Sequence, residues 1–368
     1  MMLQGLRSGL VLLDLLFVLV TALSLTPWVS WWVRFCDFPR VQFVVLGLVG
    51  TVGLALFQNT WAETAILGAA VAALLVQLWV ILPYTPIWRK DLAPARGEPG
   101  PCTLRLLVVN VLQDNRQADG LLDLIRKEDP DAFFALETDP WWDERLATLE
   151  DRWPHSIRCP IPNTYGLVFR SRLELVEPEL RFLLKKDIPS IRTKLRLRSG
   201  ALIHLHGIHP EPPAPGEADT SLPRDAELVL AGREIATTED PVILIGDLND
   251  VAWSHTSRLF RRLSHLIDPR IGRGMFNTFD AKHWFLRWPL DHVFVSEAFL
   301  LRRIERLPHI GSDHFPILVE LDYVPELESL NTEPQADAAD EAEADEKLAQ
   351  AYAEDVDRDP AGGAPAPA

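Results

Sequence analysis

Cysteine is scarce in this 368-residue chain: Cys36, Cys102 and Cys159 are the only three, and none has the C-x-x-C spacing of a metal site. A zinc–thiolate site and a disulfide framework are therefore both disfavoured. Basic residues are also outnumbered, with 36 Lys or Arg against 52 Asp or Glu. Most of the net charge of −16 belongs to residues 325–368, which hold 13 Asp or Glu against only two basic residues. The acidic balance therefore describes a tail and says little about the substrate.

Charge is nearly absent from three apolar segments at the front of the chain, Leu10–Thr26, Val41–Phe57 and Thr64–Leu82. Each is close to the ~17–25 residues that an α-helix needs to cross the hydrocarbon core of a bilayer. A buried core helix could explain one such segment and a cleaved signal peptide the first, but neither explains three in succession. We therefore expect residues 1–90 to form a membrane anchor with helices near residues 10–26, 41–57 and 64–82.

The charges and aromatic residues around these segments fit a multi-pass membrane protein. Trp61 precedes the third segment and a tryptophan cluster follows the first, where indole rings favour the membrane–water interface. Asp14 lies inside the first segment, and we expect its carboxylate to be protonated or to reach toward the interface. Four basic residues lie on the side of the large domain, against Arg7 on the other side. The positive-inside rule therefore favours a cytoplasmic domain. The four are Arg34, Arg40, Arg89 and Lys90.

Three further regions follow the predicted anchor. Residues 91–102 are rich in Pro and Gly and read as a linker. Residues 103–324 have the length and texture of one folded domain. Residues 325–368 consist largely of Ala, Asp, Glu and Pro, so we expect an acidic, disordered tail. A helix near Asp337–Tyr352 would have little to bury.

Short apolar runs alternate with helical patterns through the domain. Helices are expected at Ala118–Glu128 and Pro223–Ala236, the latter with proline in its first turn. Many strands with interspersed helices predict an α/β fold of two packed sheets with helices outside. The expected strands are Thr103–Val109, Ala132–Leu136, Tyr165–Phe169, Ile191–Leu197, Ala201–Gly207, Pro241–Gly246, Leu290–Val295 and Phe315–Leu321.

Polar residues stand at the ends of several of these strands. Asn110 and Glu137 each follow a buried run, so their side chains should enter the crevice at the carboxyl edge of a sheet. Taken alone, Glu137 could simply be a solvent-exposed residue at the end of a strand. As part of the set, Glu137 suits a Mg²⁺ ligand because magnesium prefers carboxylate oxygen and water. Asn110 would help to hold the metal or a phosphate without adding charge.

GDLN is the most specific of the sequence motifs. Asp247 and Asn249 are two residues apart, so both can face one crevice if the backbone stays extended. Asp247 could orient a water or contact a metal, and Asn249 could bind a non-bridging phosphate oxygen. An ordinary Asp/Asn turn is the alternative.

Three histidines lie close together in HLHGIHP. His204 and His206 share a strand face and read as structural, whereas His209 is out of phase and precedes a Pro-rich loop. His209 is therefore the better catalytic candidate, as a donor to phosphate or an acid for the leaving group.

The last motifs are LDHVFVS and GSDHFP. His314 needs a carboxylate to anchor one ring nitrogen, and Asp291 is the candidate. Asp313 could add a metal contact or an orienting hydrogen bond. His292 should point to the opposite face of the strand from Asp291.

In order and spacing, these motifs resemble the endonuclease/exonuclease/phosphatase superfamily with the DNase-I-like fold, over about residues 103–322. LxGDxN followed by a terminal SDH is the specific combination. The resemblance implies a four-layered α/β sandwich and a metal-dependent hydrolase. It places Asn110, Glu137 and Asp313 at the metal site. It also implies catalytic roles for a second group, comprising His209, Asp247, Asn249, Asp291 and His314.

Two positions depart from the family pattern. The glutamate motif is ALET around Glu137 where LQE is usual, so a supporting polar group is missing. Leu112 stands where an aspartate often follows the first asparagine, which puts a second metal ligand there in doubt. The apolar front resembles a membrane-anchored bacterial subgroup, which implies an inner-membrane location.

The function expected from these features is a membrane-anchored phosphoester hydrolase that uses an Asp–His dyad and carboxylate-bound Mg²⁺ or Mn²⁺. A lipid or inositol-phosphate phosphatase and an inactive membrane scaffold are the alternatives. The expected partners are the lipid bilayer and a phosphodiester, either nucleic acid or a lipid headgroup. A nuclease needs a basic surface, and a lipid substrate needs apolar contacts. The candidates are Arg258, Arg261, Arg262, Arg270 and Arg273 for the first, and Phe276, Phe279, Trp284, Phe285 and Trp288 for the second.

Overall fold

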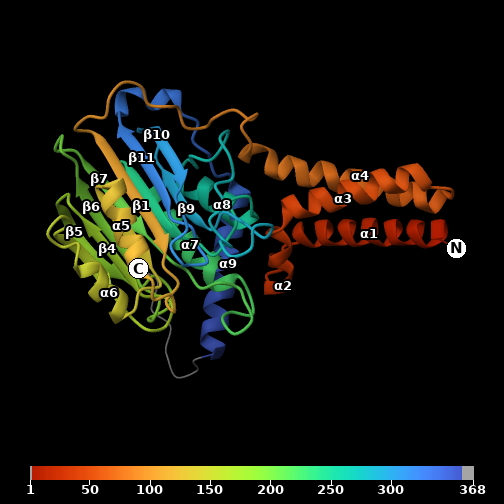
Figure 1. Ribbon diagram of the computed structural model, residues 1–368, viewed down its shortest axis with the longest axis horizontal. Coiled ribbons are helices and arrows are strands. Elements are labelled where there is room, and N and C mark those ends of the chain that lie inside the picture. Colours follow the sequence, from red (N-terminus) through yellow and green to blue (C-terminus); the bar gives the residue numbers. More distant parts are fainter. Residues whose placement is uncertain (1, 359–368) are drawn as a thin grey trace.

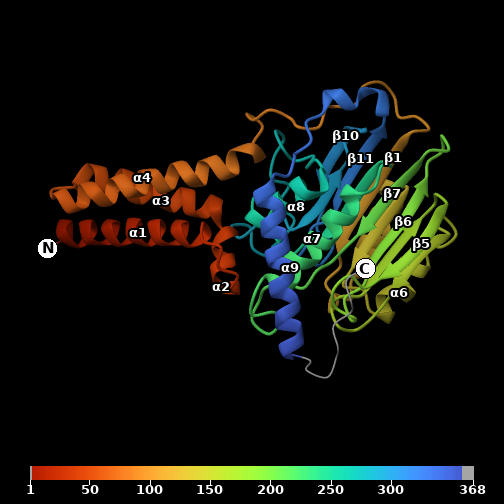
Figure 2. The same ribbon diagram turned by 180° about the vertical axis from the view of Figure 1, so that it is seen from behind.

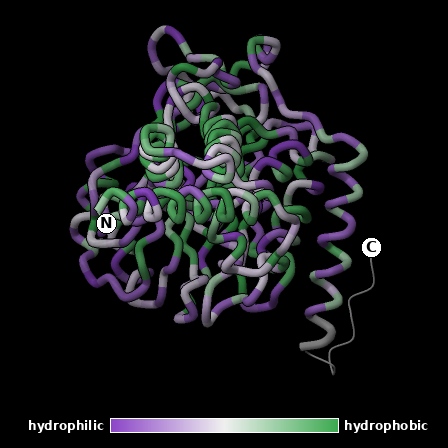
Figure 3. The backbone as a smooth tube through the Cα atoms, turned by 90° about the vertical axis from the view of Figure 1, so that its right-hand side faces the viewer, coloured by the Kyte–Doolittle hydropathy of each residue, from purple (hydrophilic) through white to green (hydrophobic). Residues whose placement is uncertain are grey.

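The computed structural model describes residues 2–358, and it has an elongated part and a globular part (Figure 1). Three long apolar helices run side by side away from a domain of two β-sheets. They are α1 (Met2–Ser24), α3 (Arg40–Phe57) and α4 (Trp61–Ile81). By length and composition, all three could cross a membrane. Their hydrophobic colouring stands out when the bundle is viewed toward the domain (Figure 3). The short α2 (Trp31–Arg34), η1 (Phe35–Asp37) and η2 (Leu82–Tyr84) lie where the bundle meets the domain.

Glycines on one side of α3 allow α1 to approach closely. A Cβ added at Gly50 would lie 2.3 Å from the Asp14 carboxylate, and one at Gly47 would lie 2.6 Å from the Phe17 ring. Asp14 is fully buried between the helices, and neither carboxylate oxygen has a hydrogen-bond partner. The expectation that Asp14 reaches toward the interface is therefore wrong, because its side chain points at α3. A protonated carboxyl group is the form that suits this position.

One sheet has six strands in the order β10-β11-β1-β2-β4-β3. Its middle pair, β1 and β2, is parallel, so their carboxyl ends meet at one edge. The six strands are β1 (Thr103–Asn110), β2 (Ala132–Leu136), β3 (His155–Cys159), β4 (Leu167–Ser171), β10 (Phe299–Arg306) and β11 (Ile317–Tyr323).

The other sheet has five strands in the order β5-β6-β7-β8-β9. Here β7 and β8 form the parallel pair, and β8 pairs antiparallel with β9. The five strands are β5 (Leu175–Arg181), β6 (Ser190–Arg196), β7 (Leu202–Gly207), β8 (Val242–Asp247) and β9 (Asp291–Val295).

Apolar side chains fill the space between the two sheets, and a second core lies outside each sheet. Inward residues such as Phe134 and Ile243 form the central core. Helices α5 (Ala118–Glu128) and α6 (Pro140–Ala147) cover the six-stranded sheet. Helices α7 (Leu222–Ala236) and α8 (His255–Ser264) cover the five-stranded sheet. The four-layered α/β sandwich is confirmed, with helix α5 and strands β2 and β7 within one residue of expectation.

The tail expectation is wrong for residues 338–358. They form α9 (Ala338–Arg358), which follows η3 (Pro325–Leu330) and lies along α7 and α8 (Figure 2). The helix buries a narrow stripe of small apolar side chains: Ala344 packs with Val229 and Leu259, and Ala351 packs with Leu222. Composition alone missed this stripe because most of the helix surface is acidic. Residues 359–368 lie outside the described part of the chain.

Helix α7 buries an acid, which predicts a pH-dependent stability. Burial, reinforced by Glu211 and opposed by Lys185, raises the pKa of Glu227 from 4.5 to about 8. The folded state therefore binds the proton more tightly than the unfolded chain. This contribution to stability is fully present below pH 4.5 and is lost as the pH rises through about 8.

We expect Glu227→Gln to stabilise the fold at pH 8.5 by roughly 1–3 kcal/mol while changing it little at pH 4.5. Denaturant unfolding of the domain at both pH values measures this. The surface variant Glu174→Gln is the control, because Glu174 is exposed. A gain for Glu227→Gln that is equal at the two pH values would contradict the titration account.

Candidate active site

Three predicted residues meet where the carboxyl ends of the parallel strands face each other. Asn110 ends β1, Glu137 follows β2, and Asp247 ends β8. The Asn110 amide nitrogen donates to Glu137 Oε1 at 2.7 Å and to Asp247 Oδ2 at 3.1 Å. The Asn110 Oδ1 accepts the Leu112 N–H at 3.0 Å, which fixes the orientation of the amide. Asn110 therefore joins carboxylates from the two sheets, and its oxygen faces the backbone rather than the carboxylates.

The GDLN segment forms the Asp/Asn turn that was the alternative to an extended backbone. Gly246 has φ +153° and sits against β7, where an added Cβ would lie 1.9 Å from the Ile208 carbonyl oxygen. Asn249 has φ +50°, so the expected extended backbone is wrong. The turn is closed by the Asn249 N–H, which donates to Asp247 Oδ1 at 2.9 Å. The Asn249 side-chain nitrogen donates to the Pro210 carbonyl at 3.0 Å, next to His209.

Asp291 and His314 form a buried hydrogen-bonded dyad. The strand register places Asp291 directly opposite Asp247. The His314 Nδ1 lies 2.7 Å from Asp291 Oδ2, and its Nε2 lies 3.5 Å from Asp247 Oδ2. Burial disfavours the charged ring, but Asp291 and Asp247 outweigh it and raise the pKa of His314 to about 10. Ser312 fixes the turn, because its hydroxyl donates to the Asn110 carbonyl and accepts the His314 N–H.

His209 approaches the same carboxylate from the loop after β7. Its Nε2 lies 4.0 Å from Asp247 Oδ2, and its ring lies against Tyr165 with centroids 5.6 Å apart. Burial lowers the pKa of His209, so its ring is neutral at pH 7 and can donate one N–H. His204 instead pairs with Asp240 at the surface. His209 therefore stands in the site, as the phase of the strand suggested.

The acidic groups fit a divalent cation. Ligand atoms of Asp247, Asp291 and His314 lie within 4.8 Å of one another, and all three residues are buried. Asp291 Oδ1 is buried without a hydrogen-bond partner. Burial raises the pKa of Glu137 to about 7, although Asn110 and His314 oppose the shift. Within residues 2–358, no Lys or Arg side chain pairs with these three carboxylates. Buried carboxylate oxygens that no Lys or Arg neutralises are donors that suit Mg²⁺.

This metal group differs from the expected set. Glu137 remains beside it through the shared Asn110 amide. Asp313 is not among its members, and its backbone carbonyl accepts the Ala281 N–H at 2.7 Å. Asn110 links Glu137 to Asp247 through its side-chain nitrogen. Asp247 and Asp291 therefore add oxygen donors to the expected set, and the metal roles of Asn110 and Asp313 stay predictions.

A buried polar network behind the GDLN turn was not predicted. Arg224 on α7 donates to the Asn249 carbonyl at 3.0 Å and lies 3.3 Å from Asp250. His292 points away from the dyad, as expected, and its Nε2 lies 2.9 Å from the Asp250 carbonyl. Arg270 completes the network by contacting His292 Nδ1 at 2.6 Å. The Asp that follows GDLN was the only sequence signal for this support.

The predicted basic surface for nucleic acid does not form. Arg261 and Arg270 are buried, the latter against Asp268, and Arg262 pairs with Asp340 on α9. Arg273 donates to the Leu92 carbonyl. A solvated helix face with Arg261 and Arg262 outward would be the plain alternative, but Arg261 is buried. These four arginines make contacts within the protein. A count of charges along the sequence cannot show which arginines will be exposed.

An aromatic loop links the dyad to the base of the helix bundle. Phe279 packs on the His314 ring with centroids 5.0 Å apart, and Trp288 stacks behind Phe279. Trp288 in turn meets Phe38, just after η1, edge-on at 5.7 Å. The loop also carries Trp284, which is 79% exposed. The His314 ring and the base of the helix bundle are thus connected through a continuous series of aromatic contacts.

Comparisons with known proteins agree with this geometry. The profile described as the Endonuclease/Exonuclease/phosphatase family matches residues 107–314, more than half of the chain. No curated protein matches the sequence. A solved D. rerio TDP2 with 14 humanising mutations is 16% identical, covering 60% of this chain and 99% of that chain with a TM-score of 0.50. The catalytic domain of human Nocturnin, solved with sulfate, is 17% identical, covering 64% and 98% with a TM-score of 0.50. At such identities the likeness concerns the fold.

Proposed function

Because this chain belongs to the endonuclease/exonuclease/phosphatase family, it is a metal-dependent phosphoester hydrolase, and we propose that it works while anchored in a membrane. Residues 1–90 are the anchor, with α1, α3 and α4 as the crossings. Residues 91–102 link the anchor to the catalytic domain, residues 103–324. The excess of basic residues on the domain side of the bundle favours a cytoplasmic domain at a bacterial inner membrane.

The contact that carries the proposal is the buried chain from Asp291 through His314 to Asp247. A raised pKa makes His314 a cation at pH 7, suited to stabilise negative charge that develops on the phosphate. Burial also raises the pKa of Asp247, which makes this carboxylate a stronger base toward an attacking water. We assign the base role to Asp247 and the charge-stabilising role to His314.

The other site residues hold the phosphate and the metal. The neutral His209 ring and the Asn249 amide can each donate a hydrogen bond to a phosphate oxygen. A divalent cation bound by Glu137 and the Asp247–Asp291 carboxylates would supply charge that offsets the phosphate. Mg²⁺ or Mn²⁺ suits these oxygen donors. The main catalytic positions are filled by suitable polar residues, which argues against the inactive-scaffold alternative.

A phosphoester at the membrane surface is the substrate class that the aromatic loop favours. Trp284 and Phe285 are 79% and 53% exposed, and the Phe285 carbonyl accepts the side-chain N–H of Gln42 on α3 at 2.7 Å. Exposed indole and phenyl rings at this level suit the boundary of a bilayer. Four of the five arginines expected to form a basic surface for nucleic acid, Arg261, Arg262, Arg270 and Arg273, serve internal contacts instead.

We expect the double variant Trp284→Ala with Phe285→Ala to hydrolyse phospholipids in mixed micelles about 10-fold more slowly than the wild type. Hydrolysis of soluble bis-p-nitrophenyl phosphate should stay within about 2-fold, because the two rings pack on each other and on His283 rather than on the dyad. Phe182→Ala, an exposed aromatic on the β5–β6 connection, is the matched control. Equal losses on both substrates would point to a damaged site instead.

The proposed function is tested by a substrate panel on the full-length protein in neutral detergent. Phospholipids, inositol phosphates, single-stranded DNA, RNA and bis-p-nitrophenyl phosphate are compared with Mg²⁺, Mn²⁺ and EDTA. Metal-dependent turnover with lipid or headgroup phosphoesters preferred is the expected result. A preference for DNA or RNA would overturn the substrate class and retain the hydrolase.

A further inference from the structure

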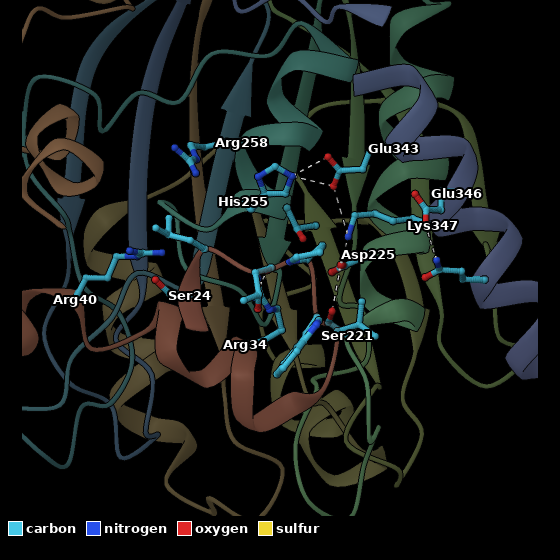
Figure 4. Close-up of a pocket in the computed structure, with 17 residues that line it drawn as sticks. Ser24, Arg34, Arg40, Ser221, Asp225, His255, Arg258, Glu343, Glu346 and Lys347 are labelled. Atoms are coloured by element: carbon cyan, nitrogen blue, oxygen red, sulfur yellow. Dashed lines mark hydrogen bonds and ion pairs between the residues drawn. The ribbon is translucent and has the colours of Figure 1, made fainter. Parts of the chain in front are cut away.

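A second polar cavity lies where the helix bundle meets the domain. Its volume is about 360 Å³, and its walls come from the end of α1, the segment after it, and helices α7, α8 and α9. Figure 4 shows Arg34, Arg40 and Ser24 on the side of the bundle, opposite Glu343 and Lys347 on α9. None of the residues that line it belongs to the catalytic group. The cavity is therefore a separate feature that hydrolysis does not explain.

Three guanidinium groups line the cavity, those of Arg34 and Arg40 from the bundle and that of Arg258 from α8. Arg34 and Arg40 both pair with Asp37. Arg258 on α8 donates only its Nε, to the Ser254 carbonyl at 3.2 Å, and pairs with no acid among the described residues. Arg34 also donates to the Thr26 carbonyl at 2.7 Å, and Arg40 donates to the Gln77 side chain at 2.9 Å. Arg258 is therefore the guanidinium group that an anion in the cavity would neutralise.

The opposite wall carries an unneutralised acid, because Glu346 accepts from Gln350 and pairs with no cation among the described residues, while its other charges are paired. Lys347 pairs with Asp225, and His255 pairs with Glu343. Burial lowers the pKa of Arg258, and the neighbouring cations Arg40 and Arg262 lower it further, whereas Tyr84 and Asp37 oppose the shift. An anionic ligand would therefore seat against Arg34, Arg40 and Arg258 rather than in the middle of the cavity.

The basic wall stands at the depth of lipid headgroups if the bundle crosses a bilayer. Ser24 is the last residue of α1 and Arg40 is the first residue of α3, so both mark the end of an apolar span. Leu25 and Trp28, which also line the cavity, are 59% and 57% exposed and continue the apolar surface of the bundle. A cavity with guanidinium groups at this depth and an apolar entrance is suited to a lipid headgroup.

We propose that this cavity binds the phosphate of an anionic phospholipid headgroup, held by Arg258, Arg40 and Arg34, on the domain side of the membrane. This inference rests on the proposed membrane anchor but not on the proposed hydrolysis. The bound lipid would fix the orientation of the domain, because one wall belongs to the bundle and the other to α7, α8 and α9.

The experiment measures binding of lipid to the full-length protein and needs no catalytic readout. Protein in a neutral detergent is titrated with phosphatidylglycerol, phosphatidylcholine or inorganic phosphate, and retained ligand is counted by native mass spectrometry. One phosphatidylglycerol should bind saturably to the wild type. Arg258→Ala should weaken it about 10-fold or more. Arg126→Ala, which removes an exposed arginine on α5, should bind as the wild type does.

Each other outcome overturns the proposal. Equal affinity for phosphatidylcholine would remove the role of lipid charge, and equal affinity for inorganic phosphate would assign the site to a soluble anion. Unchanged binding in Arg258→Ala would place the lipid elsewhere. Arg258→Gln, which keeps most of the side-chain volume, replaces the alanine variant if that variant unfolds. Absence of saturable phosphatidylglycerol binding to the wild type decides against the site without any variant.

Discussion

Replacing His314 with alanine is expected to lower the rate of phosphoester hydrolysis by about 10³-fold or more. The variant removes the imidazolium that Asp291 orients at 2.7 Å and that lies 3.5 Å from Asp247. It also leaves two buried carboxylates without their only cationic neighbour in the described residues. Steady-state rates on bis-p-nitrophenyl phosphate with saturating Mg²⁺ measure the loss, which should fall on kcat rather than KM.

The control for His314→Ala is His204→Ala. His204 is a strand histidine that pairs with Asp240 outside the site, so its loss should change the rate less than about 2-fold. Asp291→Asn should reproduce much of the His314→Ala loss, because the amide cannot stabilise the imidazolium as a carboxylate does. A His314→Ala variant that folds and keeps wild-type activity would remove the dyad from the mechanism.

Glu137→Gln is expected to raise the concentration of Mg²⁺ needed for half-maximal activity by about 10²-fold. Glutamine keeps the shape and can still contact Asn110, but it loses the carboxylate charge that the cation needs. Metal-dependent rates and direct Mn²⁺ binding by calorimetry measure the shift. Glu174→Gln at the surface is the matched control.

The same carboxylate predicts how metal binding responds to pH. In the metal-free protein, burial raises the pKa of Glu137 to about 7, so the group is increasingly protonated below that pH. Protons then compete with the cation, and the apparent metal affinity should fall as pH is lowered through about 7. Glu137→Gln should flatten this dependence. A pH response identical to that of the wild type would show that Glu137 is not a ligand.

The position of the site could be predicted because strand ends are local features. Asn110, Glu137 and Asp247 each follow a buried apolar run, and parallel strands bring such ends together. Asp291 and His314 were paired by chemistry, since an imidazole in this role needs a carboxylate partner. The hydrogen bond at 2.7 Å is consistent with that reasoning.

The detailed ligand geometry could not be predicted in the same way. The approach of Asp291 to Asp247 depends on the antiparallel register of β8 and β9. The spacing of residues within either motif does not indicate this register. Asn249 takes a positive φ that its neighbours impose, so its side chain turned toward Pro210 instead of following an extended strand. Tertiary contacts override local preference at such turns.

The surface of the domain was harder to predict from the sequence than the site. Arg261 and Arg262 looked like a basic patch, but their partners Asp91 and Asp340 lie in segments far along the chain. Helix α9 was missed for a related reason, because its apolar stripe is only a few small residues wide. Charge patterns in sequence do not show which charges will be neutralised by distant segments.

The most direct measurement of the central claim is the rate of bis-p-nitrophenyl phosphate hydrolysis by the full-length protein as Mg²⁺ or Mn²⁺ is added after EDTA treatment. The account predicts no turnover without metal, saturable recovery with it, and no recovery in His314→Ala. A folded wild-type protein that binds Mn²⁺ poorly and hydrolyses nothing at any metal concentration would contradict it.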